Sequence, residues 1–145
     1  MEEGWEGDVI EYRRDLSGLS EENLSEGFFE GWPNRPSPRK HWCVLRNSEY
    51  IALALDADRI IGFATGLSDG AIAGFIPLLE VLPEYRGRGI GRRLVETLLE
   101  DMAHLYSVDL VCERALNEFY EKIGFKTGPD AMIIRRPQNM KETLK

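Results

Sequence analysis

The sequence is poor in the residues from which disulfide frameworks and zinc sites are built. It has two cysteines, Cys43 and Cys112, and two histidines, His41 and His104, in 145 residues. The cysteines do not form a C-x-x-C pair and the histidines lie far apart, so we expect neither a disulfide framework nor a metal site. We interpret all four residues as structural. This cysteine usage makes the reducing cytoplasm the default localisation.

The sequence also lacks long apolar runs and a surplus of basic residues. No run approaches the roughly 20 apolar residues of a membrane span, and the acidic start M-E-E-G-W-E is unlike a targeting peptide. There are 25 acidic residues against 18 Lys and Arg, for a net charge of −7. Nucleic-acid binding needs a basic face, so we expect no nucleic-acid partner and no membrane partner. A cationic substrate suits this charge better.

What is present is the composition of an ordinary globular protein. Hydrophobic residues make up 43% and charged residues 30% of the chain. We expect a single domain over residues 1–136 and a loose C-terminal tail at 137–145.

The spacing of apolar residues predicts alternating strands and helices. Pro77 lies inside the third predicted strand and cannot donate to a sheet ladder, so we expect a bulge or a parting of strands near it. The predicted strands are 8–14, 50–55, 59–65, 72–82, a buried strand at 108–112, and 131–136. The predicted helices are 20–30, 39–46, 89–106 and 115–123, with a proline-rich loop at 32–38.

The most informative segment is V-L-P-E-Y-R-G-R-G-I-G at 81–91. It carries three glycines at alternate positions and runs from a predicted strand directly into a long amphipathic helix. Glycines allow close approach of a ligand, and the first turn of a helix offers unpaired N–H groups and a positive dipole end. The segment therefore predicts a phosphate or pyrophosphate site. It matches neither the P-loop nor the dinucleotide-binding fingerprint.

Two blocks together resemble the GCN5-related N-acetyltransferase (GNAT) superfamily. They are R-x-x-G-x-G, at Arg86, Gly89 and Gly91, and A-L-N-E-F-Y-E-K-I-G-F at 115–125. The blocks G-W-P-N-R-P-S-P-R-K at 31–40, L-R-N-S at 45–48 and I-I-G-F-A-T-G-L-S-D at 60–69 resemble plant plastid serotonin N-acetyltransferases and their bacterial relatives. The resemblance implies an α/β (α+β) fold, in which helices flank both faces of a mixed, mostly antiparallel sheet. Splayed central strands would form the acyl-CoA cleft.

The resemblance also implies acetyl-CoA as cosubstrate, without a metal. Pantetheine would pair with the strand that ends at Val81, and pyrophosphate would rest on the glycine-rich loop. The family's asparagine contact to the cofactor is missing, since Glu113 and Arg114 occupy its positions. The cofactor-binding residues implied are Leu79, Val81, Arg86, Gly87, Arg88, Gly89, Ile90, Gly91 and Arg92.

Two residues are candidates for proton transfer. Tyr120 matches the family's tyrosine and would protonate the leaving thiolate. Glu80 is the only ionisable residue inside the third strand and is a candidate proton acceptor. A water chain could take that proton instead, and Glu80 could equally form a salt bridge.

The acceptor pocket would be walled by aromatic residues, although core packing explains them as well. Asp69 is a candidate at its mouth, with turn formation as the alternative reading. We expect transfer of an acetyl group to a primary amine by direct attack on the thioester, with an arylalkylamine or another small amine favoured. The alternatives are acetylation of a protein lysine or N-terminus and a non-catalytic acyl-CoA-binding module. The sequence leaves open whether the protein forms a homodimer. The aromatic candidates are Phe28, Phe29, Trp32, Trp42 and Tyr50.

Overall fold

The computed structural model describes residues 9–128, 136 and 138. Its five strands form one sheet in chain order, β1-β2-β3-β4-β5. The first four strands are antiparallel neighbours, and β5 runs parallel to β4. The predicted mixed, mostly antiparallel sheet is thereby confirmed. The strands are β1 Ile10–Arg13, β2 Tyr50–Asp56, β3 Arg59–Ser68, β4 Ala73–Val81 and β5 Ser107–Asp109.

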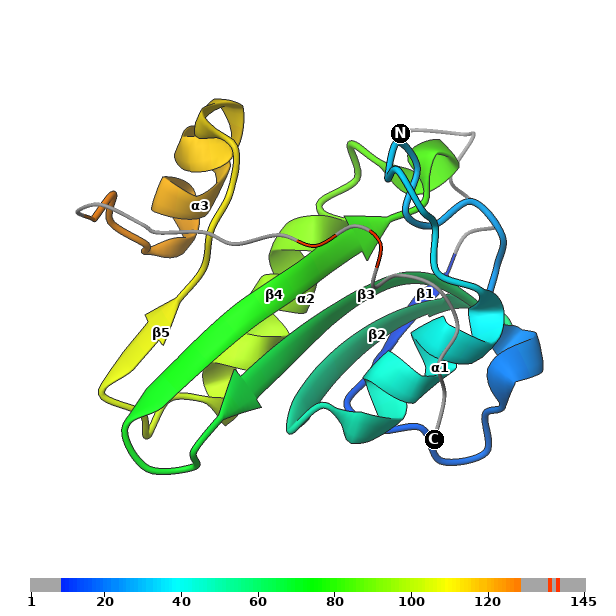
Figure 1. Ribbon diagram of the computed structural model, residues 1–145, viewed down its shortest axis with the longest axis horizontal. Coiled ribbons are helices and arrows are strands. Elements are labelled where there is room, and N and C mark those ends of the chain that lie inside the picture. Colours follow the sequence, from blue (N-terminus) through cyan, green and yellow to red (C-terminus); the bar gives the residue numbers. More distant parts are fainter. Residues whose placement is uncertain (1–8, 129–135, 137, 139–145) are drawn as a thin grey trace.

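Helices cover both faces of the sheet, as expected (Figure 1). Neighbouring residues on β3 show which helix lies on which face, because successive side chains of a strand point to opposite sides. Phe63 contacts His41 of α1, Pro38–Asn47, with ring centroids 4.4 Å apart. A Cβ added at Gly62 would lie 3.2 Å from Leu94 of α2, Ile90–Asp101. The third helix, α3 Asn117–Ile123, follows β5.

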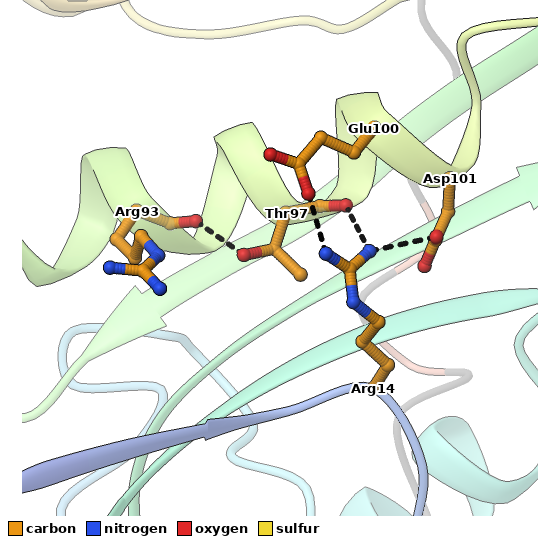
Figure 2. Close-up of polar contacts among 5 residues, drawn as sticks. All are labelled: Arg14, Arg93, Thr97, Glu100 and Asp101. Atoms are coloured by element: carbon orange, nitrogen blue, oxygen red, sulfur yellow. Dashed lines mark hydrogen bonds and ion pairs between the residues drawn. The ribbon is translucent and has the colours of Figure 1, made fainter.

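The position of α2 is set by contacts from β1 and the residue after it. Arg14 binds the C-terminal half of α2 through Thr97 O at 3.1 Å, Glu100 Oε1 at 2.5 Å and Asp101 Oδ1 at 2.7 Å (Figure 2). A cation is favourable there because the helix C-terminus carries a partial negative charge. At the other end of α2, the Arg93 guanidinium lies 4.6 Å from the centroid of the Tyr12 ring. These contacts orient the N-terminus of α2 relative to the sheet.

The predicted helix at 20–30 is wrong. Ser20 does cap a turn, but the turn is the short 3-10 helix Glu21–Asn23. Leu24 then forms a bridge with Ile60 of the sheet, and the chain adopts positive φ at Gly27 and Phe29. An α-helix cannot continue through left-handed residues, so the chain turns as a loop and buries Phe28 and Phe29.

Other elements differ from the prediction in length. The strand expected at 108–112 ends at Asp109, and its side chains are half-buried or exposed. Helix α2 ends at Asp101 instead of residue 106. The predicted strand at 131–136 falls almost entirely outside the described residues, and so does most of the tail. No helix in the part of the chain that the structure describes has both the length and the apolar character needed to cross a membrane.

Candidate active site

The strands β4 and β5 part close to Pro77, as the sequence predicts. Their pairing covers only Ala73–Phe75 of β4 and the whole of β5. On the other side of β4, the register with β3 shifts between Thr65 and Leu67. There, two residues of β4, Ile76 and Pro77, oppose a single residue of β3, which is a β-bulge.

Beyond the bulge, β4 presents backbone groups at the edge where it has left β5. Leu82 N–H donates to Ile61 O of β3 at 2.9 Å. Backbone groups alternate in direction along an antiparallel strand, so those of Leu79 and Val81 point to the opposite edge. Arg86 reaches this edge, where its Nε donates to Val81 O at 2.9 Å.

The glycine-rich loop that follows β4 is an open cradle. Gly87 has φ 78° and Gly89 φ 81°, and a Cβ built on either residue would meet no atom within 4 Å. Gly89 caps α2, and its carbonyl accepts the N–H of Arg93 at 3.1 Å. Helix geometry leaves the N–H groups of the first turn, which includes Ile90, without intrahelical partners.

Three arginines of this segment bind protein groups. Besides its bond to Val81 O, Arg86 lies 4.0 Å from Glu30. Arg88 lies over the Tyr85 ring at 5.0 Å, and Arg92 donates to Glu96 Oε2 at 2.9 Å. These side chains add positive potential to the loop, while the backbone shapes the cradle.

Gly91 has a different surrounding from the other two glycines. A Cβ there would lie 3.6 Å from Phe119 of α3 and 3.9 Å from Val81. Gly91 therefore lies where α3 packs on the start of α2, with room for a Cβ but not for a large side chain. Arg92 adds a 3.5 Å contact from Nη2 to Lys122 O of α3.

This packing places Tyr120 of α3 on a cleft. The cleft has a volume of about 820 Å³ and is lined by Phe75 of β4, by β5 and the residues that follow it, by Leu99 of α2 and by α3. Tyr120 is 8% exposed, and no hydrogen-bond partner of its hydroxyl lies among the described residues. Burial, and to a smaller extent the neighbouring Cys112, raises the pKa of the phenol. A buried phenol with a raised pKa is a proton donor at neutral pH. The residues lining the cleft include Phe75, Leu99, Val108, Cys112, Asn117 and Tyr120.

Glu80 lies on the face of the sheet that α1 covers. It pairs with Phe63 across the two strands, and its Oε1 accepts the backbone N–H of Phe29 at 2.6 Å. Burial raises the pKa of this carboxyl, and Arg86 and Arg35 oppose that shift.

The proposed acceptor residues do not all gather at one place. Phe28 packs in the core against His41 and Phe63. Trp32 reaches the surface and meets Phe29 edge-on at 5.1 Å, whereas Trp42 is half-buried against the core. Tyr50 contacts His104 on the opposite face of the sheet.

Asp69 lies near the paired end of β4 and β5, away from the parted end. Its Oδ1 accepts the N–H groups of Ala71, Ile72 and Ala73 at 2.8, 2.8 and 3.2 Å, and these bonds lower the pKa of the carboxyl. We therefore correct its assignment from the mouth of the site to the turn between β3 and β4.

Two polar residues that the sequence analysis left out of the predicted site are among those that line the cleft. Cys112 and Asn117 both line it, and the Cys112 thiol lies 3.5 Å from Asn117 Oδ1. The signal for Asn117 was its spacing, since residues three apart on a helix share a face and Tyr120 is three residues later. The described residues contain no cluster of three or more side chains suited to a metal ion.

Comparisons with known proteins point to one family. Residues 20–125 match the family model described as "Acetyltransferase (GNAT) family". A crystal structure of a proposed acetyltransferase from Deinococcus radiodurans R1 superposes with a TM-score of 0.86 and 40% identity, covering 90% of this chain and 91% of that one.

Curated relatives are more distant and mostly longer. Histone acetyltransferase TAP1 of Glycine max is 31% identical, over 70% of this chain and 49% of that protein. Serotonin N-acetyltransferase 2, chloroplastic, of Oryza sativa is also 31% identical, over 83% of this chain and 63% of that protein. The chain spans about half the length of the first curated relatives it matches.

Proposed function

The chain belongs to the GNAT family of acetyltransferases, and on that premise we propose that it transfers an acetyl group from acetyl-CoA to a primary amine. The observation that carries the proposal is the parted edge of β4, which leads directly into the glycine cradle at the start of α2. The free space at Gly87 and Gly89 fits a diphosphate, and the outward backbone groups of Leu79 and Val81 fit the amides of a pantetheine arm.

Acetyl-CoA supplies the acetyl group as an activated thioester. The Val81 N–H, at the open edge of β4, is suited to polarise a carbonyl as an oxyanion donor. Tyr120 holds a proton on the cleft and would give it to the departing thiolate sulfur. An alkyl ammonium must lose a proton before it can attack, because its pKa resembles that of lysine. A water chain would accept that proton, and Glu80, whose Oε1 already accepts the Phe29 N–H, is the alternative acceptor.

A small amine is the acceptor that we favour. The net charge of −7 attracts a cation, and the rings of Phe29 and Trp32 lie beside the strand that carries the cofactor edge. The similarity to the rice serotonin N-acetyltransferase supports an arylalkylamine. A protein lysine is the second candidate, supported by the similarity to the soybean histone acetyltransferase.

An acceptor panel tests the proposal. The purified chain is mixed with acetyl-CoA and, in turn, an arylalkylamine, a polyamine, an amino sugar and a lysine-containing peptide, and thiol release is measured. We expect the highest kcat/KM with the arylalkylamine, and a decrease of kcat/KM for cationic amines as salt rises. Preference for the peptide would favour the protein acceptor. Binding of acetyl-CoA without thiol release for any acceptor would indicate a non-catalytic module.

A further inference from the structure

We propose that Glu80 is a positioning residue that fastens the acceptor loop, residues 25–36, to the cofactor strand β4 and thereby sets the affinity for the amine. This inference rests on the proposed function. It concerns how the aromatic wall of the acceptor site is held in place, and it assigns to Glu80 a task different from proton removal.

The acceptor loop has a backbone conformation that needs an external support. Gly27 has φ 105°, Phe29 φ 65° and Gly31 φ 85°, so three alternate residues have left-handed backbone. Glycine adopts this conformation freely, but a residue with a Cβ does not. Phe29 is one of two non-glycine residues with positive φ among the described residues. A left-handed aromatic residue persists only where surrounding contacts hold it.

Glu80 supplies that contact at the strained residue itself. Its Oε1 accepts the Phe29 N–H at 2.6 Å, a short hydrogen bond to a charged acceptor. The carboxylate is half-buried, so water competes less for this bond than for one on the surface. The ring of Phe29 is 3% exposed and packs against His41 and Phe63, with centroids 4.9 and 5.9 Å apart.

The other polar contacts of the loop do not involve the Phe29 N–H. At the start of the loop, Ser25 Oγ donates to Ile60 O of β3 at 2.8 Å. Arg35, an exposed residue of the loop, donates from Nη2 to Phe28 O at 2.8 Å. Arg86 of the glycine-rich loop approaches Glu30 only to 4.0 Å, and both side chains are largely exposed. Ion pairs of this kind contribute little to stability. The Glu80 bond is therefore the polar link that joins the left-handed Phe29 itself to the sheet.

Because side chains and backbone groups alternate along a strand, residues 79–81 of β4 can serve both acetyl-CoA and the amine. Leu79 and Val81 direct their backbone groups to the parted edge, while the Glu80 side chain lies with Phe63 on the face covered by α1. From Phe29 the wall continues to Trp32, which is 36% exposed and touches Phe29 edge-on. Movement of Phe29 displaces the exposed ring that an aryl or ammonium group would contact.

Kinetics of two substitutions separate this role from that of a general base. Glutamine keeps an oxygen that can accept the Phe29 N–H but cannot take a proton from an amine, whereas alanine removes both functions. For Glu80→Ala we expect KM for the amine to rise about tenfold or more, the loss expected for one charged hydrogen bond, while Kd for acetyl-CoA stays within about twofold. Glu80→Gln should recover most of that loss and keep the shape of the wild-type pH profile. Glu11→Ala, which removes an exposed glutamate of β1 paired with Arg13 at 3.9 Å, is the matched control.

Hydrogen exchange tests the hydrogen bond between Glu80 and the Phe29 N–H without relying on turnover. Glu80→Ala should speed exchange of the amides of the acceptor loop, Phe29 above all, by about tenfold or more relative to wild type, while Glu80→Gln and Glu11→Ala should not. Equal loss of kcat in Glu80→Gln and Glu80→Ala, with unchanged KM, would identify a proton acceptor and overturn the proposal. So would unchanged exchange in Glu80→Ala. If the wild-type protein acetylates no amine but the exchange results are as expected, the proposed function is wrong, whereas the conclusion that Glu80 holds the loop is confirmed.

Discussion

At the scale of single residues, Tyr120 carries the clearest expectation. Tyr120→Phe keeps the ring and its edge contacts with Phe119 and Phe125 and removes only the hydroxyl. We expect kcat to fall about 100-fold, the contribution typical of a positioned acid, with little change in stability or in acetyl-CoA affinity. Steady-state kinetics and calorimetric titration measure these quantities.

The pH dependence of the wild-type rate follows from the direction of the pKa shift of Tyr120. Burial raises the pKa of Tyr120 above 10.0, so the phenol of the wild type stays protonated through neutral and mildly alkaline pH. Loss of the proton donor should therefore not limit the wild-type rate below about pH 10. A folded Tyr120→Phe protein with wild-type kcat would mean that Tyr120 only packs in the cleft.

At the scale of elements, we expect acetyl-CoA binding by the glycine-rich loop to depend on backbone conformation more than on charge. Gly89→Ala places a Cβ on a residue with φ 81°, at a cost of roughly 1–2 kcal/mol, and shifts the N–H groups of the cradle. We expect acetyl-CoA affinity, measured by isothermal titration, to fall about tenfold or more.

Gly18→Ala is the matched control for this prediction. Gly18 has φ 76° and equally free space around it, but it lies between β1 and the first 3-10 turn. Both variants should lose similar stability, and only Gly89→Ala should lose affinity. Equal affinity in the two variants would argue against the cradle. Gly91 is a separate case, since a larger residue there presses on Phe119 and alters the packing of α3.

At the scale of the whole molecule, His41 couples stability to pH. Its side chain is 3% exposed, no partner of Nε2 lies within the described part of the chain, and burial lowers its pKa from 6.5 to about 4. Between these values the unfolded chain binds a proton that the folded protein does not, so stability decreases as pH falls. This group contributes stability above pH 6.5 that is lost by about pH 4, on the order of 3 kcal/mol.

Comparison with His41→Phe isolates this contribution, because carboxylates titrate alike in both proteins. We expect urea unfolding between pH 7 and 4.5 to show a smaller loss of stability in His41→Phe than in wild type. Phenylalanine suits the site, which is already formed by the rings of Phe28, Phe29 and Phe63. Identical pH dependence of the two proteins would show that the pKa of His41 is the same in the folded and the unfolded protein.

Local sequence determined the parts of this protein that depend on neighbours in the chain. Alternating apolar residues predicted the β2–β3 hairpin, and Pro77 predicted the irregularity in β4 because proline lacks an N–H for the ladder. The spacing of glycines before an amphipathic helix predicted the cradle at Gly87 and Gly89, where φ is positive. Family motifs pointed to Tyr120, which lies on the cleft beside the parted strands.

Only the tertiary structure decided features that depend on residues far apart in the chain. Residues 20–30 have a helical pattern of apolar residues. The hydrogen bond from the Phe29 N–H to Glu80, 51 residues away, and the burial of Phe28 and Phe29 nevertheless hold residues 25–31 as a loop. The glycine spacing predicts Gly91 as a phosphate-binding residue, and only the tertiary structure shows that Gly91 also lies against Phe119. Local propensity amounts to tenths of a kcal/mol per residue, whereas burying an aromatic side chain or satisfying a buried charge contributes more. Long-range packing therefore prevails wherever the two conflict.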